Sequence, residues 1–485
     1  MLFNSLPFLI FFPCVFVLYY ALPFRLRKYM LLIASYYFYM CWKPEFIVLI
    51  LFSTLVDYFC GLGMVRYPGR KRWLLATSLV MNLGLLFFFK YLNFFGETLT
   101  ALCRAVSIPF SAPALNIILP VGISFYTFQT LSYTIDVYKG RLKPERDFVT
   151  FALFVSFFPQ LVAGPIEKAS NLLPQLKEEH RFTYENASWG AKLMAWGFFK
   201  KMVVADQLAI LIVDPVYQNL GSYEGGILVL ATCAFAFQIY CDFGGYSDIA
   251  RGCARMMGIR LMENFRRPYF AVSVTDFWRR WHISLTSWFR EYIYIPLGGN
   301  RRGAAKKCLF VWITFTLSGL WHGAEWSFVL WGVLYALLMD LEFLLGVGKP
   351  RKRHPAVHML QCLITFLIVC FLWVFFRAAN IGEALYVVRH SLWGIGSPVL
   401  YCRTAVDQLF TALGLGMEEI VMLLGTLLLL FLFDLADERR DAIAMVSSWP
   451  AAVRWACYLG LVLIVLVFGV YGPRYDVRAF AYFDF

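Results

Sequence analysis

Two histidines lie in a part of the sequence that is otherwise rich in tryptophan and apolar residues. His282 belongs to the segment WRRWHISLTSWFR and His322 to LSGLWHGAEW, and each directly follows a tryptophan. An ionisable side chain among residues suited to lipid is costly to bury, which favours a functional site. Because imidazole accepts and releases protons near neutral pH, both residues are candidate acid–base catalysts. A purely structural, hydrogen-bonded role is the alternative for each of them.

A basic, glycine-containing loop separates the two histidines. Its sequence, IPLGGNRRGAAKK, contains Asn300, Arg301, Arg302, Lys306 and Lys307. Forked arginine donors suit a soluble ligand that carries phosphate groups. Charge alone favours a plainer interpretation, in which the loop only fixes the orientation of the neighbouring membrane spans.

Two further patterns could take part in chemistry. Asp242 and Asp248, in the segment CDFGGYSD, could form a proton or ion relay, or they could cap helices. The chain ends in FAYFDF, where phenylalanines surround Tyr482. We expect so aromatic an end to dock onto protein, which makes Tyr482 either an anchor or a reacting hydroxyl.

The composition indicates which elements must position these residues. Of the 485 residues, 60% are hydrophobic and 15% are charged. Soluble domains contain about 45–50% apolar and about 25% charged residues. The apolar residues recur in blocks, and several blocks reach the ~18–20 residues that cross a bilayer as a helix. The sequence therefore predicts an all-α, polytopic membrane protein.

Charge and cysteine usage argue against other classes of protein. The net charge is +13, but lysine and arginine gather in short loops between apolar runs, as the positive-inside rule requires. The charge thus indicates a lipid bilayer and no nucleic-acid partner. The 12 cysteines include no CxxC pair, so we expect neither disulfides nor a metal site.

The basic loops also predict the topology. Strongly basic loops follow the first, third and fifth apolar runs, and later ones lie at 301–307 and 349–353. If all of these loops are cytoplasmic, both termini lie outside, after roughly ten to twelve crossings. The aspartates of CDFGGYSD are expected to follow a helix that ends near Cys241.

His322 is predicted to lie at the tip of a hairpin. The apolar runs 310–321 and 326–345 stand between two loops that we expect to be cytoplasmic, so they must turn back on themselves. The ~14 residues before Trp321 rise about 21 Å as a helix, which is less than a hydrocarbon core of ~30 Å. His322 is therefore expected deep in the membrane.

With these residues in view, the sequence resembles the membrane-bound O-acyltransferase (MBOAT) family, in its bacterial branch of alginate and polysaccharide O-acetyltransferases. The resemblance implies a single domain over 1–485, built as a ring of helices around a central funnel, with an aromatic tail at 472–485. It rests on the ordered segments PVGISFYTFQTLSYTIDVYKG, FPQLVAGPI, ENFRRPY, DFWRRWHISLTSWFREYIYIPLGGNR, LSGLWHGAEW, WVFFRA and YFDF.

The resemblance also implies a reaction and a place for it. His322 would be the general base, His282 would polarise the thioester or orient the hydroxyl, and Tyr482 would relay the acyl group. The co-substrate would be a cytoplasmic thioester such as acetyl-CoA, without a bound cofactor. The protein would act in the bacterial inner membrane with a membrane-anchored, extracytoplasmic partner, on an extracytoplasmic polysaccharide. The implied donor-binding residues are Asn300, Arg301, Arg302, Lys306, Lys307 and Trp281.

Three alternatives remain open at this point. Within the same class, the transfer could bring acetyl or D-alanyl groups to teichoic acid or peptidoglycan. In a different class, the two histidines with Asp242 and Asp248 could form the pathway of a proton-coupled transporter. A third possibility is a scaffold without catalytic activity that only docks the partner.

Overall fold

The computed structural model describes residues 1–347 and 354–471, and these residues form helices and connecting segments without any strand. The predicted all-α class is therefore confirmed. Seven of the described helices are long and apolar enough to cross a membrane. The expected ten to twelve crossings stay a prediction, because shorter apolar helices such as Leu6–Ala21 fall outside that criterion.

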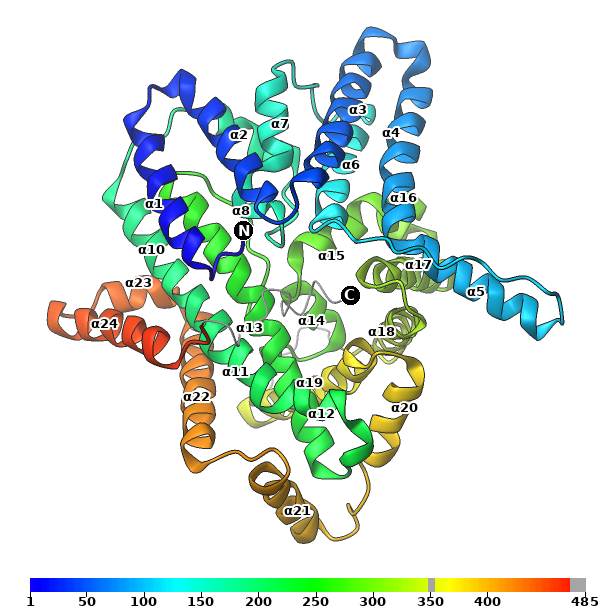
Figure 1. Cartoon of the computed structure of the whole chain (residues 1–485), viewed down its shortest axis with the longest axis vertical. Coiled ribbons are helices and arrows are strands. Elements are labelled where there is room, and N and C mark those ends of the chain that lie inside the picture. Colours follow the sequence, from blue (N-terminus) through cyan, green and yellow to red (C-terminus); the bar gives the residue numbers. More distant parts are fainter. Residues whose placement is uncertain (348–353, 472–485) are drawn as a thin grey trace. The chain divides into compact units, whose positions relative to one another are not determined.

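Internal contacts divide the chain into two compact units, 1–191 with 250–262 and 192–249 with the residues from 263 onward. The prediction of a single functional domain is not tested by this division. Residues 1–191 of the first unit are drawn in blue to green-cyan in Figure 1. Its helices include α1 Leu6–Ala21, α2 Phe24–Met40, α3 Ile47–Arg66, α4 Lys71–Leu86, α5 Leu92–Ala105, α6 Ile123–Tyr138, α7 Phe148–Ser156, α8 Phe158–Leu161 and α9 Ala169–Lys177.

A polar cluster joins α3, α4 and α6 of the first unit. Asp57 is fully buried, and its carboxylate accepts hydrogen bonds from the Ser78 hydroxyl, the Asn82 amide and, at 3.2 Å, the Thr134 hydroxyl. In lipid there is no hydrophobic driving force for helices to associate. Hydrogen bonds between polar side chains of neighbouring helices therefore help to hold a membrane bundle together. This cluster therefore serves packing.

Residues 226–249 of the second unit belong to a long helix that the sequence pattern does not predict. Helix α13 runs from Gly226 to Met256, straight through the double glycine, so the expected end near Cys241 is wrong. The glycines allow close packing instead of a break. A Cβ on Gly245 would lie 2.7 Å from the carbonyl oxygen of Gly197, in the neighbouring α10 (Tyr184–Phe198).

Two buried lysines follow α10, where the helix widens into the π-helical segment Phe199–Ala205. Lys200 Nζ lies 2.9 Å from Asp248, and Lys201 Nζ lies 2.6 Å from Asp242 and 2.8 Å from Asp206. Asp242 and Asp248 thus sit within α13 as partners of buried cations, and the interpretation as helix caps is wrong. Buried charges require such partners because desolvation is costly.

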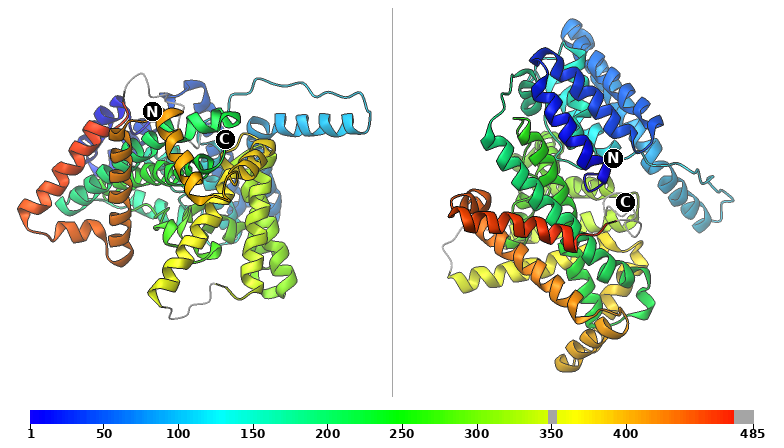
Figure 2. Two further views of the ribbon diagram at one scale, coloured as in Figure 1. Left: turned by 90° about the horizontal axis from the view of Figure 1, so that it is seen from below. Right: turned by 60° about the vertical axis from the view of Figure 1, so that its left-hand side comes forward.

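The expected hairpin is confirmed and consists of α17 (Ala304–His322) and α18 (Trp326–Leu344), which Figure 2 shows as an antiparallel pair. Glycines bring the two backbones together. A Cβ on Gly319 would lie 2.2 Å from the carbonyl oxygen of Phe328, and one on Gly332 equally close to that of Phe315. Small residues at such crossings are typical of membrane helices.

The remaining helices of the second unit surround this hairpin and α13. A core of buried apolar and aromatic residues joins α13, α14, α18 and α19. The bounds are α11 Asp206–Leu208, α12 Asp214–Gln218, α14 Val274–Arg280, α15 Ile283–Phe289, α16 Ile295–Leu297, α19 Pro355–Arg377, α20 Ile381–His390, α21 Pro398–Thr411, α22 Met417–Arg439, α23 Ala442–Ser447 and α24 Ala451–Phe468.

Candidate active site

His282 occupies a sharp turn between α14 and α15. The Ser273 side chain caps α14 at the backbone N–H of Asp276, and the helix ends where Trp281 becomes extended. His282 itself has φ +42° and ψ +53°, in the left-handed region that residues other than glycine seldom adopt. Such strain persists only where the surroundings hold it, and it clusters at functional sites.

The strand-like segment after residue 263 holds this turn through its backbone. The N–H of Arg266 donates to the carbonyl of Arg280 at 2.8 Å, and the N–H of Ile283 donates to the carbonyl of Asn264 at 2.9 Å. The two backbone hydrogen bonds thus bracket His282. They supply the constraint that the strained conformation needs.

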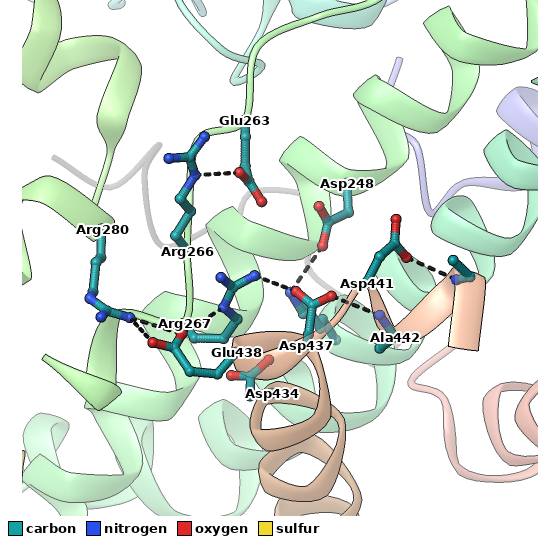
Figure 3. Close-up of polar contacts among 12 residues, drawn as sticks. Asp248, Glu263, Arg266, Arg267, Arg280, Asp434, Asp437, Glu438, Asp441 and Ala442 are labelled. Carbon is teal, nitrogen blue, oxygen red and sulfur yellow. Dashed lines mark hydrogen bonds and ion pairs between the residues drawn. The ribbon is translucent and has the colours of Figure 1, made fainter. Parts of the chain in front are cut away.

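Ion pairs of Arg267 and Arg280 with Glu438 also hold the turn at His282 (Figure 3). Arg280 binds Glu438 at 2.9 Å, and Arg267 binds the same Glu438 at 3.0 Å, as Figure 3 shows. Arg280 also binds Asp276 at 3.1 Å. Arg267 also contacts Asp437 at 2.5 Å. Because Glu438 joins both arginines, the end of α22 is tied to both segments that bracket His282.

His322 ends α17 inside a cage of aromatic rings. Its side chain is buried, with Trp321, Trp331 and Phe376 at ring-centre distances of 5.0, 5.2 and 5.3 Å. The next residue, Gly323, leaves room for the Phe328 ring, which a Cβ there would meet at 2.1 Å. The tight turn expected at WHG is therefore present, and its glycine accommodates protein rather than ligand.

The two candidate histidines come together. Their imidazole ring centres are 6.3 Å apart, and the ring planes are inclined at 61°. His282 is fully buried, and its ring lies edge-on to Phe243 at 4.7 Å. His282 lies outside the seven candidate spans, and burial lowers its pKa to about 3 because desolvation penalises the charged imidazolium. The ring is therefore neutral at physiological pH.

A cavity of about 1140 Å³ is lined by residues close in the chain to the two histidines, although neither histidine is among its lining residues. Thr314 and Ser318 line it on α17, and His322 follows Ser318 by one helical turn on that face. On α14 the cavity reaches Trp278, one turn before His282. Its walls carry Arg279, Arg280, Arg290, Lys307 and His358, with Asp276 and Asp340.

The cavity suits a long ligand with an anionic part. Arg279 and Arg290 are exposed within it, and Lys307 lies over the ring of Phe343 at 3.0 Å. Arg280 is already paired with carboxylates, so it contributes less free positive charge. The apolar wall from Leu285 to Phe315 suits a thin, uncharged arm that approaches the histidines.

The structure separates the predicted donor-binding residues into two groups. Asn300 and Lys307 line the cavity, and Asn300 accepts a hydrogen bond from the Tyr294 hydroxyl. Arg301, Arg302 and Lys306 are exposed and are not among its lining residues, and Trp281 packs in the core against Phe265, Phe277 and Trp373. Tyr482 lies outside the described residues.

Sequence reasoning missed several residues of this site. Asn264 and Phe376 lie within the quoted segments ENFRRPY and WVFFRA, but nothing in their types singles them out. Their roles become visible only when the fold brings Asn264 against His282 and Phe376 against His322. Arg290 ends the segment WRRWHISLTSWFR, whose arginines suit phosphate binding and contact with lipid headgroups equally.

Comparison with known proteins adds independent evidence. Residues 145–382 match the membrane-bound O-acyltransferase (MBOAT) family. A probable alginate O-acetylase of Pseudomonas putida is 36% identical over 483 residues, which cover 96% of each chain. A peptidoglycan O-acetyltransferase of Helicobacter pylori is 35% identical, covering 75% of this chain and 73% of its own. A teichoic acid D-alanyltransferase of Bacillus subtilis is 28% identical, covering 53% and 69% respectively.

Proposed function

The chain belongs to the membrane-bound O-acyltransferase family and is a multi-pass membrane O-acyltransferase, and from this premise we propose that it moves acetyl groups from acetyl-CoA toward an extracytoplasmic polysaccharide. The proposal of a polysaccharide acceptor follows from the alginate O-acetylase relatives. The observation that carries the chemistry is the pair His282 and His322, whose buried rings meet and whose neighbours in the chain, Trp278 and Ser318, line a cationic cavity.

We assign the general base to His322. As the acceptor hydroxyl oxygen attacks the thioester carbonyl carbon, His322 takes the hydroxyl proton. The new C–O bond forms, the C–S bond breaks, and the departing thiolate receives the proton from the His322 imidazolium. General base catalysis of this kind contributes about 10²–10⁴-fold to a rate. The aromatic cage excludes water, which protects the thioester from hydrolysis.

The donor would lie in the cavity, with its phosphates near Arg279, Arg290 and Lys307 and its acyl arm directed toward the histidines. The cationic residues of the cavity wall suit the phosphates of acetyl-CoA, and the apolar residues of the wall suit its uncharged arm. In this arrangement the exposed Arg301, Arg302 and Lys306 would act at most during the approach of the donor.

The later steps rest on the predicted topology. With the basic loops in the cytoplasm of a bacterial inner membrane, both termini lie outside, and Tyr482 could carry the acyl group to a membrane-anchored partner. Mass spectrometry after incubation with labelled acetyl-CoA, without partner, tests this relay. An acetyl group on the Tyr482 peptide, absent in Tyr482→Phe, is expected. An unmodified peptide in a protein that remains active with its partner would rule the relay out.

A free-thiol assay tests the reaction class. Purified protein in proteoliposomes, with partner and acetyl-CoA, should release CoA thiol in step with acetylation of the partner or polymer. Movement of a solute across the proteoliposome without thiol release would instead favour the transporter. Competition between acetyl and D-alanyl thioesters separates the O-acetyltransferase from the D-alanyl alternative.

A further inference from the structure

The side chain of Asn264 lies directly against the His282 imidazole. Asn264 is buried, and its Oδ1 is 3.1 Å from His282 Nδ1. The same Oδ1 accepts hydrogen bonds from the backbone N–H of Ser284 at 3.2 Å and from the Ser284 hydroxyl at 2.9 Å. On its other side, Asn264 Nδ2 donates to the Ser247 hydroxyl at 3.3 Å.

These contacts fix which end of the Asn264 amide faces the histidine. A backbone N–H can only donate, so the atom that meets the N–H of Ser284 must be the amide oxygen and not the NH₂ group. The usual ambiguity between the oxygen and nitrogen of an asparagine is therefore removed by the Ser284 backbone.

The same contacts fix the proton of His282. Because Asn264 Oδ1 is an acceptor, His282 Nδ1 must be the donor, and a neutral imidazole carries a single proton. The Ser284 hydroxyl, 3.5 Å from Nδ1, already gives its proton to Asn264, so it also faces Nδ1 with its lone pairs. In the neutral ring, Nε2 is then the unprotonated nitrogen.

We propose that Asn264 is a positioning residue that holds His282 in the Nδ1-protonated tautomer and in its left-handed turn, so that His282 Nε2 serves as a hydrogen-bond acceptor. The proposal deepens the proposed function and rests on it for its catalytic consequence. A neutral His282 of this tautomer cannot donate to a thioester carbonyl. Nε2 of this tautomer can only accept, so it holds the bound acceptor hydroxyl through the single O–H proton, which turns to His322 for the attack. Of the two roles left open by the sequence, His282 then has the orienting one.

Asn264 can hold the turn as well as the tautomer. Its backbone carbonyl accepts from Ile283, and its side chain accepts from Ser284, so it bonds to both residues that follow the strained His282. One residue therefore couples the backbone conformation of the turn to the protonation of its ring. In histidines generally, the hydrogen bond made by one ring nitrogen sets which of the two nitrogens carries the proton.

Nitrogen-15 NMR of protein labelled in its imidazole rings tests the tautomer directly. The signals of His282 among the six histidines are identified by their loss in His282→Gln. We expect a protonated Nδ1 and an unprotonated Nε2 in the wild-type protein, and a mixture of tautomers in Asn264→Ala. A wild-type His282 with its proton on Nε2 would overturn the proposal, whatever reaction the protein catalyses.

The pH dependence of thiol release tests the catalytic consequence. In Asn264→Asp, a carboxylate beside Nδ1 stabilises the imidazolium and raises the pKa of His282. The nitrogen-15 titration of His282, which lies near pH 3 in the wild type, should move upward by one pH unit or more, and kcat/KM should fall once the ring is charged because only the neutral ring accepts at Nε2. Within the described part of the chain, the ring contacts of His282 are with Phe243, Phe265, Trp321 and the titratable His322, so the titration is repeated in His322→Ala to separate the two histidines.

Asn116→Asp provides the matched control, because it makes the same change at an exposed position that does not line the cavity. Its pH profile should superimpose on that of the wild type. If Asn264→Asp is folded and the nitrogen-15 titration of its His282 coincides with that of the wild type, the proposal is wrong. A wild-type protein that releases no thiol would refute the proposed function, while the NMR result would still decide the tautomer.

Discussion

His282 and His322 lie with their ring centres 6.3 Å apart, although forty positions separate them in the sequence. One comes from a strained turn and the other from the last residue of a helix, so different elements fix the two rings. Because one reacting hydroxyl can contact both, we predict that their contributions are not additive. His282→Ala and His322→Ala should each lower kcat/KM at least 100-fold, and the double variant should be little worse than the slower single variant. If the double variant instead loses kcat/KM by the product of the two single losses, the histidines do not act on a shared site.

The cationic cavity predicts an effect on donor binding. Arg290→Gln removes an exposed charge from the cavity wall, so the KM for acetyl-CoA should rise about tenfold while kcat changes little. Arg403→Gln, at an exposed position with only a helical partner, should leave KM unchanged. A comparison with Arg301→Gln shows whether the basic loop also holds the donor. An unchanged KM in Arg290→Gln would place the donor elsewhere.

The close crossing of α17 and α18 predicts a stability effect. In Gly319→Ala the new methyl would lie 2.2 Å from the carbonyl oxygen of Phe328, so the helices must separate, at a cost of about 1–3 kcal/mol or more. Thermal unfolding in detergent should show a lower midpoint. Gly425→Ala is the matched control, since its methyl would meet nothing within 4 Å in the middle of α22. Equal midpoints for both variants would argue against the tight hairpin.

The buried lysines predict a second stability effect. Lys201→Met would leave the carboxylates of Asp206 and Asp242 buried without their cation, and breaking such a pair costs about 3–5 kcal/mol. The double variant Lys201→Met/Asp242→Asn should recover part of the lost stability, because one carboxylate is then neutral. Loss of thiol release in proportion to unfolding is expected. If Lys201→Met keeps the stability of the wild type and loses only solute transport in proteoliposomes, the transporter is favoured.

Much of this arrangement could be predicted from the sequence. The apolar blocks and basic loops predict a helical membrane protein, and the short runs around WHG predict the hairpin, because length and hydrophobicity act locally. The uninterrupted helix α13 could not be predicted, because the double glycine that breaks helices in water here serves close packing against Gly197. The roles of Asn264 and of the lysines depend on contacts between distant segments, which a single sequence does not display.

The central claim is that His322 acts as the base in acyl transfer from a thioester, and thiol release by His322→Ala measures it most directly. The variant is compared with the wild type and with His390→Ala, whose histidine stacks on Tyr386 in α20. At equal melting temperature and with partner present, the His322→Ala rate should fall at least 100-fold while His390→Ala keeps the wild-type rate. Thiol release by folded His322→Ala within threefold of the wild type would contradict the account.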